Sequence, residues 1–482
     1  MTPCRTLAMA VALAFPAAAL AAPSDADLQE LRQQLKALKD SYESRIQALE
    51  KRLAEAESAP AAQPRPASVA APAAPAAPMA AAPRRMGESS SGSGFNPEVS
   101  VILQGAMTRT SQDPTSYRIG GFTPAGEPEE VGPPRRRGFS LRETELVMTA
   151  NIDPNFRGYL NLALTAENEV EVEEAYVQTL GLGNGFNAKF GRYLSGVGYL
   201  NEQHPHTWDF ADAPLAYTAF FGNRLVSEGL QLKWLAPTPF YLELGLEGGR
   251  DDTFPGSGRN KGGSALGVLF ARAGGDVGTD HSWRVGLSQV RTKPRERAYE
   301  DVDSLGAATS NSFTGKSRTS VLDFVWKWAP NGNPSVNNFK FQAEYFRRQE
   351  DGTLACADVD AASPSLCTGG LADAYAARQS GLYAQAVYQF MPRWRVGYRH
   401  DRLNSGTTRI GLVDAGTLSA EDFGLLKAYK PKRDAVMVDY SPSEFSRLRV
   451  QLARDKSRPD ATDNQVWLQY IMSLGSHGAH KF

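Results

Sequence analysis

The chain has 482 residues, with 52 basic and 53 acidic side chains and a formal net charge of −1. This balance argues against a nucleic-acid-binding protein, which usually carries a strongly basic domain, so no nucleic acid is expected among its partners. After the N-terminus there is no run of about 20 apolar residues, which excludes a helical membrane protein. Aromatic residues make up 10% of the chain, and glycine occurs 44 times. Such a composition is compatible with β-strands that show an apolar side chain at every second position.

Residues 1–21 predict a secretory signal peptide. Arg5 supplies the positive n-region, residues 7–20 form the apolar h-region, and Ala19-Leu20-Ala21 matches an A-x-A cleavage site. The alternative is a membrane anchor, for which this apolar stretch is too short. An exported protein is therefore expected.

Residues 22–57 predict a short periplasmic coiled coil. Leucines from Leu28 to Leu53 follow a heptad spacing with one stutter between Tyr42 and Ile46. Such a narrow apolar seam favours self-association, and a homotrimer is the expected assembly. The alternatives are a single amphipathic helix packed on the following domain and a contact with the cell wall. Residues 58–94 are rich in Ala and Pro, then in Ser and Gly, and predict a linker.

Residues 95–482 predict a large all-β domain, because apolar and polar residues alternate with a period of two in many segments. Clear examples are residues 160–165, 230–234, 242–247, 283–288, 322–328, 339–345, 394–399, 447–452 and 465–474. A soluble β-sandwich or propeller has the same pattern as a membrane barrel. Charged partners within the strands, aromatic residues at the ends of the apolar faces and the terminal Phe482 favour the barrel.

The length of this domain sets the size of the barrel. At roughly 24 residues for a strand and its connection, we expect a transmembrane antiparallel barrel of about 16 strands, with 14 and 18 as open alternatives. A barrel of this size is wide enough for a water-filled lumen. It would lie in the outer membrane, with lipid and lipopolysaccharide as surroundings and the coiled coil in the periplasm.

Two short motifs resemble the phosphate-selective porin family of Gram-negative outer membranes. They are the Glu174-Ala175-Tyr176-Val177 strand and the Lys189-Phe190-Gly191-Arg192-Tyr193 strand that follows it. Residues 439–449 and 465–474 are similar to the last hairpin of that family. The resemblance implies an outer-membrane porin barrel.

A closer likeness is to a proteobacterial subgroup sometimes labelled zinc-regulated or TonB-dependent outer-membrane proteins. It rests on the sequences HPHTWDF at 204–210, DAPL at 212–215 and GAH at 478–480. In place of the globular plug of TonB-dependent receptors, this chain has a coiled coil and a linker. The subgroup label implies a link to zinc.

Charged side chains at predicted lumen-facing positions are the candidate pore-lining residues. The acidic set is Glu167, Glu169, Glu171, Glu173, Glu243 and Glu247, and the basic set is Arg395, Arg399, Arg447 and Arg449. Clustered carboxylates attract cations, and a basic wall attracts anions. The acidic run has the alternative of a solvated turn or strand end. The strand arginines have the alternative of pairing with Asp401, Asp439 or Asp455.

His204, His206 and Asp209 are the densest candidates for a metal site in a chain with six histidines. His-x-His places both imidazoles on one side of an extended segment, and the carboxylate adds an oxygen ligand suited to zinc. The alternative is a His-Pro-His loop that packs against Trp208. Apart from zinc, no cofactor is expected.

Cys356 and Cys367 are the only cysteines after the signal peptide. In an exported protein this pair predicts a disulfide across a surface loop, with two free thiols as the alternative. No arrangement of residues points to catalysis, so no catalytic residue and no enzymatic activity are expected. The primary hypothesis is a passive porin for small hydrophilic solutes or ions. A metal-linked uptake or binding protein and an envelope tether are the alternatives.

Overall fold

The computed structural model describes residues 97–126, 132–133, 137–165, 169–250, 253–257, 265–360 and 362–475. The predicted signal peptide, coiled coil and linker lie outside these residues, as do Glu167 and the last seven positions of the chain.

The described residues contain eighteen strand segments that belong to one sheet. The first nine are β1 Glu98–Thr110, β2 Gly138–Leu141, β3 Thr144–Asn151, β4 Phe156–Leu164, β5 Val170–Thr179, β6 Phe186–Leu194, β7 Val226–Leu235, β8 Tyr241–Arg250 and β9 Leu266–Val277. The others are β10 His281–Thr292, β11 Arg297–Val302, β12 Ala308–Trp328, β13 Asn338–Asp358, β14 Leu371–Met391, β15 Trp394–Ile410, β16 Lys432–Ser443, β17 Ser446–Lys456 and β18 Asp463–Gly475.

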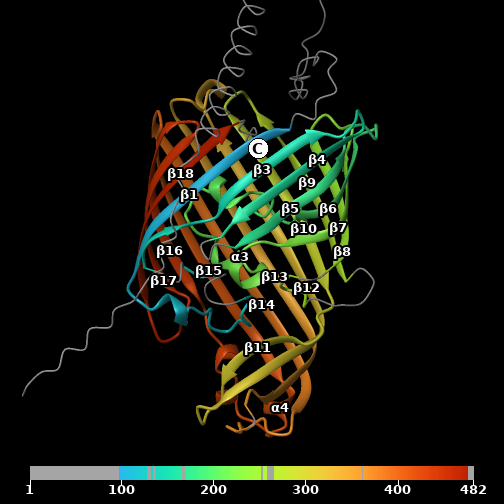
Figure 1. Cartoon of the computed structure of the whole chain (residues 1–482), viewed down its shortest axis with the longest axis vertical. Coiled ribbons are helices and arrows are strands. Elements are labelled where there is room, and N and C mark those ends of the chain that lie inside the picture. The colour runs from blue at the N-terminus through green and yellow to red at the C-terminus, as the bar shows by residue number, and fades with distance from the viewer. Residues whose placement is uncertain are drawn as a thin grey trace, which may run out of the picture. The chain divides into compact units, whose positions relative to one another are not determined.

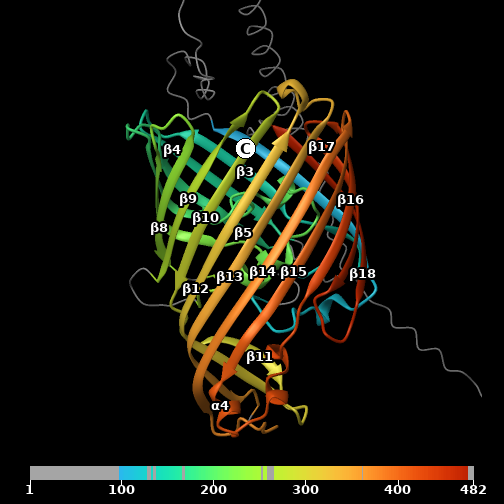
Figure 2. The same ribbon diagram turned by 180° about the vertical axis from the view of Figure 1, so that it is seen from behind.

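The sheet closes on itself as an antiparallel barrel. β1 pairs with β18 on one side and with β2 and β3 on the other. β2 and β3 thus form one interrupted barrel strand, and β10 and β11 do the same along β12. The described residues therefore form a closed barrel (Figures 1 and 2). It has sixteen antiparallel strands, which confirms the barrel part of the predicted fold and its strand number.

The alternation in the sequence determines which side chains face inward. In β18, Val466, Leu468 and Tyr470 are 38–45% exposed, whereas the alternate residues Gln465, Trp467 and Gln469 are almost fully buried. The same alternation recurs along β16 and β17. The apolar outer surface is suited to lipid, and the polar residues fill the interior. Aromatic pairs such as Trp394 and Tyr440, with ring centroids 4.7 Å apart, lie near the short turns.

The wall formed by β12 to β15 is taller than the rest of the barrel (Figure 2). Beyond the other strands it is joined by β11, by the short helix α4 (Gly411–Asp414) and by the 3-10 helix η4 (Ala420–Leu426) (Figure 1). A buried apolar cluster there includes Tyr299, Phe313 and Leu412. The structure joins Cys356 to Cys367 by a disulfide within this cluster, with a Cα–Cα distance of 5.4 Å.

The connection between β6 and β7, residues 195–225, lies inside the barrel (Figure 1). We call it the lumen segment. It contains the 3-10 turn η2 (Pro205–Thr207) and the helix α3 (Leu215–Phe221), all seven residues of which are buried. α3 packs against β14, where Gly381 has no side chain to collide with Phe220 and Ala216. A further 3-10 turn, η1 (Pro114–Ser116), and η3 (Pro330–Gly332) lie in other connections.

Among the described residues, no helix is long and apolar enough to cross a membrane.

Candidate functional site

The two ends of the lumen segment are tied together at its base. The Ser195 amide donates to the Leu225 carbonyl at 3.0 Å. The Asn201 side chain donates to the carbonyls of Ser195 and Leu225, each at 2.8 Å, and accepts from the Leu225 amide at 2.7 Å. Since Asn201 is almost fully buried, these bonds hold the segment at a fixed point of exit from the wall.

A buried carboxylate on β13 accepts hydrogen bonds from the first turn of the lumen segment. Glu344 accepts hydrogen bonds from the amides of Tyr199 and Leu200, at 3.2 and 3.0 Å, and from the Tyr217 hydroxyl at 2.9 Å. Gly198 lies against the same carboxylate with φ +66°, where a Cβ would overlap it. The segment can approach this wall because position 198 is glycine.

The opposite edge of the segment meets a basic wall. Asp212 lies 2.8 Å from the guanidinium groups of both Arg399 on β15 and Arg433 on β16. Asp209 contacts Lys340 on β13 and lies 3.1 Å from Arg395 on β15. Each of these two carboxylates of the segment thus forms ion pairs with two cationic side chains of the barrel wall.

Arg447 and Arg449 on β17 hold the backbone of the segment. Both donate to the carbonyl of Trp208, at 3.1 and 2.6 Å. Arg395 and Arg399 also contact Asp439 and Asp401 on the strands, which are pairings foreseen as the alternative. All four arginines predicted to face the lumen therefore lie on one wall and contact the lumen segment or the strand carboxylates beside it. Their role in lining a pore stays a prediction.

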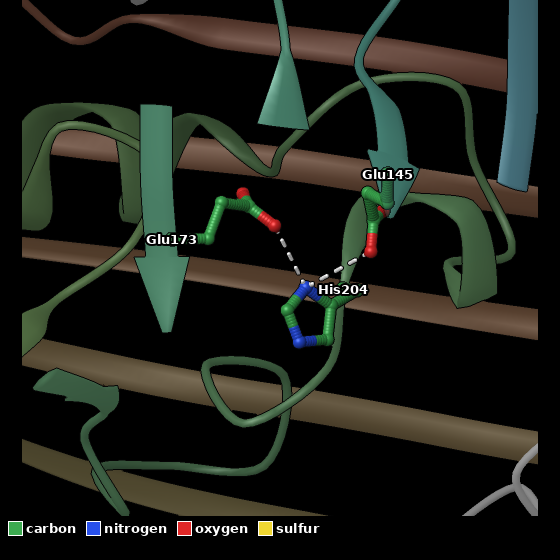
Figure 3. A group of neighbouring side chains, drawn as sticks. All are labelled: Glu145, Glu173 and His204. Atoms are coloured by element: carbon green, nitrogen blue, oxygen red, sulfur yellow. Dashed lines mark hydrogen bonds and ion pairs between the residues drawn. The ribbon is translucent and has the colours of Figure 1, made fainter. Parts of the chain in front are cut away.

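On the acidic wall, two histidines of the segment meet three glutamates. His204 Nδ1 lies 3.1 Å from Glu173 Oε2 and 3.5 Å from Glu145 Oε2 (Figure 3). His204 Nε2 lies 2.9 Å from Glu174, and His206 Nδ1 lies 2.6 Å from the second oxygen of Glu145. The two imidazoles are stacked, with centroids 5.8 Å apart.

A β-bulge brings two consecutive glutamates to this wall. Asn161 on β4 pairs with Glu174, and Leu162 pairs with Val172, so Glu173 is the extra residue of β5. Because a bulge shifts the alternation by one residue, Glu173 and Glu174 both contact the lumen segment. In a regular strand they would face opposite sides.

The structure corrects part of the predicted acidic set of pore-lining residues. Glu169 precedes β5 and is exposed, and Glu171 is exposed on the strand. Glu167 lies outside the described residues. Glu169 therefore fits the alternative of a solvated turn or strand end, because the strand begins at Val170.

The two predicted glutamates of β8 are both engaged in polar contacts. Glu243 accepts from Arg272 at 2.9 Å. Glu247 is buried and accepts from the Gly196 amide and the Gln231 side chain, each at 2.7 Å. Both residues thus contribute to the polar interior.

The predicted metal set is not brought together. Asp209 is held by Lys340, Arg395 and the Gln385 amide, whereas the His204 and His206 rings face glutamates. The His-x-His spacing correctly placed two imidazoles side by side. Its carboxylate partners come from β3 and β5, and no spacing within residues 204–209 could reveal them.

Two cavities lie on either side of the lumen segment. One, of about 680 Å³, is bounded by Glu98, Leu180 and Ser473 at the end of the short turns and by His204 and Asp209 of the segment. The other, of about 660 Å³, lies toward the taller end and is bounded by Thr218 and Ala219 of the segment. The lumen segment therefore lies between two cavities of similar volume.

Burial and neighbouring charge act in opposite directions on the acids of the segment. Burial alone would raise the pKa of Asp212, but the charges of Arg399 and Arg433 outweigh it and lower the pKa to about 2. The pKa of Asp209 is lowered further still, again against the effect of burial, chiefly by Lys340 and Arg395. Both carboxylates are ionised at neutral pH, which keeps the segment attached to the basic wall.

Several residues of the site have no local sequence signal. Glu145 and Asn161 lie on the neighbouring strands β3 and β4, and Glu344 lies on the distant strand β13, so the segment contacts both sides of the barrel. The sequence does show each of them as a polar residue at an inward position of an alternating strand. This pattern predicts that the side chain faces the lumen, but it does not predict which residue the side chain contacts.

A closed sixteen-strand barrel with an apolar outer surface, a polar interior and an inward connection has the architecture of a transmembrane β-barrel. The chain is similar in fold to solved outer-membrane proteins. A loop-deletion mutant of OmpT of Vibrio cholerae has 11% identity and a TM-score of 0.47, with 79% of this chain and 99% of that chain covered. The channel DcaP of Acinetobacter baumannii has 10% identity and a TM-score of 0.44, with 79% and 97% covered.

One curated relative shows the family of the chain. It is an uncharacterized protein of Aquifex aeolicus (strain VF5), 31% identical over 415 residues, with 80% of each chain covered. The chain belongs to the same family as this protein. No family model matches the sequence, and the resemblance to phosphate-selective porins stays a prediction.

Proposed function

We propose that the protein is an outer-membrane channel through which small hydrophilic solutes or ions diffuse passively. The lumen segment narrows the barrel, and the charged walls on either side of it select what passes. The observation that carries this proposal is the pair of cavities, about 680 and 660 Å³, on both sides of the segment in one closed barrel.

The distribution of charge supports a channel for polar solutes. β3 and β5 present Glu145, Glu173 and Glu174 on one side of the lumen segment. The strands β13 and β15 to β17 present cations to its other side. Figure 1 shows β3 on the near face of the barrel and Figure 2 shows β13 to β15 on the face seen from behind, with β16 and β17 at one side. Charges of opposite sign on facing walls orient polar solutes and exclude apolar ones.

Liposome swelling tests this function directly. Proteoliposomes that contain the purified full chain are diluted into isosmotic solutions of sugars and amino acids of increasing size. We expect rapid swelling with the smallest solutes and a decline as size increases. The same protein denatured by heat before reconstitution serves as the control. Swelling no faster than that of empty liposomes for every solute would contradict a diffusion channel.

A metal-linked function is the second candidate, and the cluster of His204 with Glu145 and Glu173 favours it. An envelope tether stays a prediction, since its proposed element, residues 22–57, lies outside the described residues. The homotrimer, the lipopolysaccharide contacts and the expectation of no enzymatic activity also remain predictions.

A further inference from the structure

We propose that Glu145, Asn161, Glu173 and His204 bind one divalent transition-metal ion, which fastens the lumen segment to the barrel wall. The first three residues belong to the neighbouring strands β3, β4 and β5, and His204 belongs to the segment. This inference rests on the metal-linked candidate proposed above, which it makes specific, and it does not depend on the channel function.

The geometry of four atoms carries the proposal. His204 Nδ1 lies 3.1 Å from Glu173 Oε2 and 3.5 Å from Glu145 Oε2 (Figure 3). Asn161 Nδ2 lies 2.9 Å from each of these two carboxylate oxygens and 3.3 Å from His204 Nδ1. In a tetrahedral zinc site with bonds of about 2.0–2.1 Å, the ligand atoms are about 3.3 Å apart. The observed separations match that spacing.

The Asn161 amide supplies an independent observation. Asn161 is fully buried, and its Oδ1 atom has no hydrogen-bond partner among the described residues. In this structure Nδ2 points into the cluster and donates to the carboxylates of Glu145 and Glu173. On metal binding, a 180° turn of the amide would bring the unpartnered Oδ1 to the position of Nδ2, where it would serve as the fourth ligand.

The surrounding residues are those that orient metal ligands. The other imidazole nitrogen, His204 Nε2, lies 2.9 Å from Glu174, and a carboxylate in this place fixes the ring and its tautomer. The second oxygen of Glu145 is held by His206 at 2.6 Å, and the second oxygen of Glu173 is held by Arg224. Each charged ligand therefore has its own partner outside the site.

Charge and access also suit a cation. Three buried carboxylates, Glu145, Glu173 and Glu174, meet at His204, with His206 and Arg224 as further partners of Glu145 and Glu173, and such a cluster of carboxylates attracts a dication. One nitrogen and two or three oxygen ligands are suited to zinc and to other divalent first-row metals. The cavity of about 680 Å³ reaches Glu145 and His204, so an ion has a path from the end of the short turns.

Zinc titration of the full chain in detergent tests the site. The protein is stripped with chelator, and zinc alone is then titrated by calorimetry. We expect one zinc per chain in the wild type and at least about tenfold weaker binding in His204→Gln and Glu173→Gln. His400→Gln is the matched control, because His400 also lies 2.8 Å from a carboxylate, Asp434, but both are well exposed. Its affinity should equal that of the wild type.

A spectroscopic readout separates binding from loss of fold. Cobalt bound at a tetrahedral site gives strong visible absorption, which we expect in the wild type and in His400→Gln but not in His204→Gln. Each variant is first shown to be a folded barrel by its change of gel mobility on heating. Absence of saturable zinc binding in the wild type, or wild-type affinity in folded His204→Gln, would overturn the proposal. Wild-type affinity in Asn161→Leu would overturn the four-residue ligand set.

Discussion

At the scale of single residues, buried ion pairs fix the lumen segment to its basic wall. Asp212 has two guanidinium partners, and neither it nor they have more than a small exposed fraction. Removing one member of a buried pair leaves the other members without their charge partner, which costs more than the pair itself contributes. Asp212 is therefore the position where a small change should have a large effect.

We expect Asp212→Asn to lower the free energy of unfolding by about 3–5 kcal/mol, because Arg399 and Arg433 remain buried without their carboxylate. Denaturant unfolding in detergent measures the change. Asp351→Asn is the matched control, because Asp351 pairs with Arg378 in an exposed position and such pairs contribute less than about 1 kcal/mol. Equal effects of the two substitutions would contradict the role of the buried pair.

The same aspartate gives a pH dependence with a defined sign. Its pKa is lowered from 3.8 to about 2 in the folded protein, so its contribution to stability is present above about 4 and is lost as the pH falls through 2. We expect the stability difference between wild type and Asp212→Asn to be constant from pH 7 to 5 and to shrink below pH 4. A difference that grows on acidification would show that the sign is wrong.

At the scale of residues, the sequence predicted which strand side chains face inward, but it did not predict which groups these side chains and the histidines contact. Alternation alone placed Arg395, Arg399, Arg447 and Arg449 on the inner side, because strands of period two expose one face to lipid. It missed the partner groups of His204, since these depend on the inward path of the lumen segment and on the bulge in β5. Asp209 was grouped with the histidines by proximity in sequence, although its charge is neutralised on the basic wall.

At the scale of elements, the lumen segment is the connection that the sequence described least well. Its motif was recognised, but nothing in residues 195–225 alternates, so no strand or inward path was predicted. The bulge at Glu173 was equally hidden, because two consecutive glutamates fit either a strand end or a bulge. Irregular features of this kind arise from packing inside the barrel, and period-two analysis detects only the regular strands.

Gly198→Ala should loosen the contact between the segment and β13. Its Cβ would overlap the Glu344 carboxylate, and we expect a loss of about 1–3 kcal/mol beyond the cost of the positive φ. Gly278→Ala is the control, since Gly278 has φ +65° and open space around the added Cβ. Thermal unfolding of both variants measures the difference. Equal midpoints would contradict close packing at Gly198.

The disulfide should act locally, at the tall end of the barrel. Replacing both Cys356 and Cys367 by Ala should make the connection between β13 and β14 more sensitive to protease, because the bond closes this loop. The barrel itself should remain resistant, since its strands are paired along their whole length. Proteolysis of folded protein followed by mass analysis locates the cut. Unchanged resistance of that connection would contradict the expectation.

At the scale of the whole molecule, the sequence predicted the barrel well. Strand number followed from length, and the apolar outer surface followed from alternation in segments such as 465–474.

The assembly of several chains into an oligomer is predicted from a different part of the sequence, because the heptad pattern lies in residues 22–57. We expect the full chain to be trimeric and deletion of 22–57 to weaken the trimer, as measured by native mass spectrometry. If the deletion variant forms an equally stable trimer, the barrel and not residues 22–57 holds the chains together, and the expectation is contradicted.

The central claim is that the barrel conducts and that the lumen segment sets its bore. Single-channel conductance in planar bilayers tests this most directly, with the full chain compared to a variant in which residues 203–222 are replaced by a short Gly-Ser linker. The bonds of Asn201 at the base of the segment remain possible in this variant. We expect discrete openings in both proteins and a severalfold larger unit conductance in the variant. Equal conductance, or no openings in either folded protein, would contradict the claim.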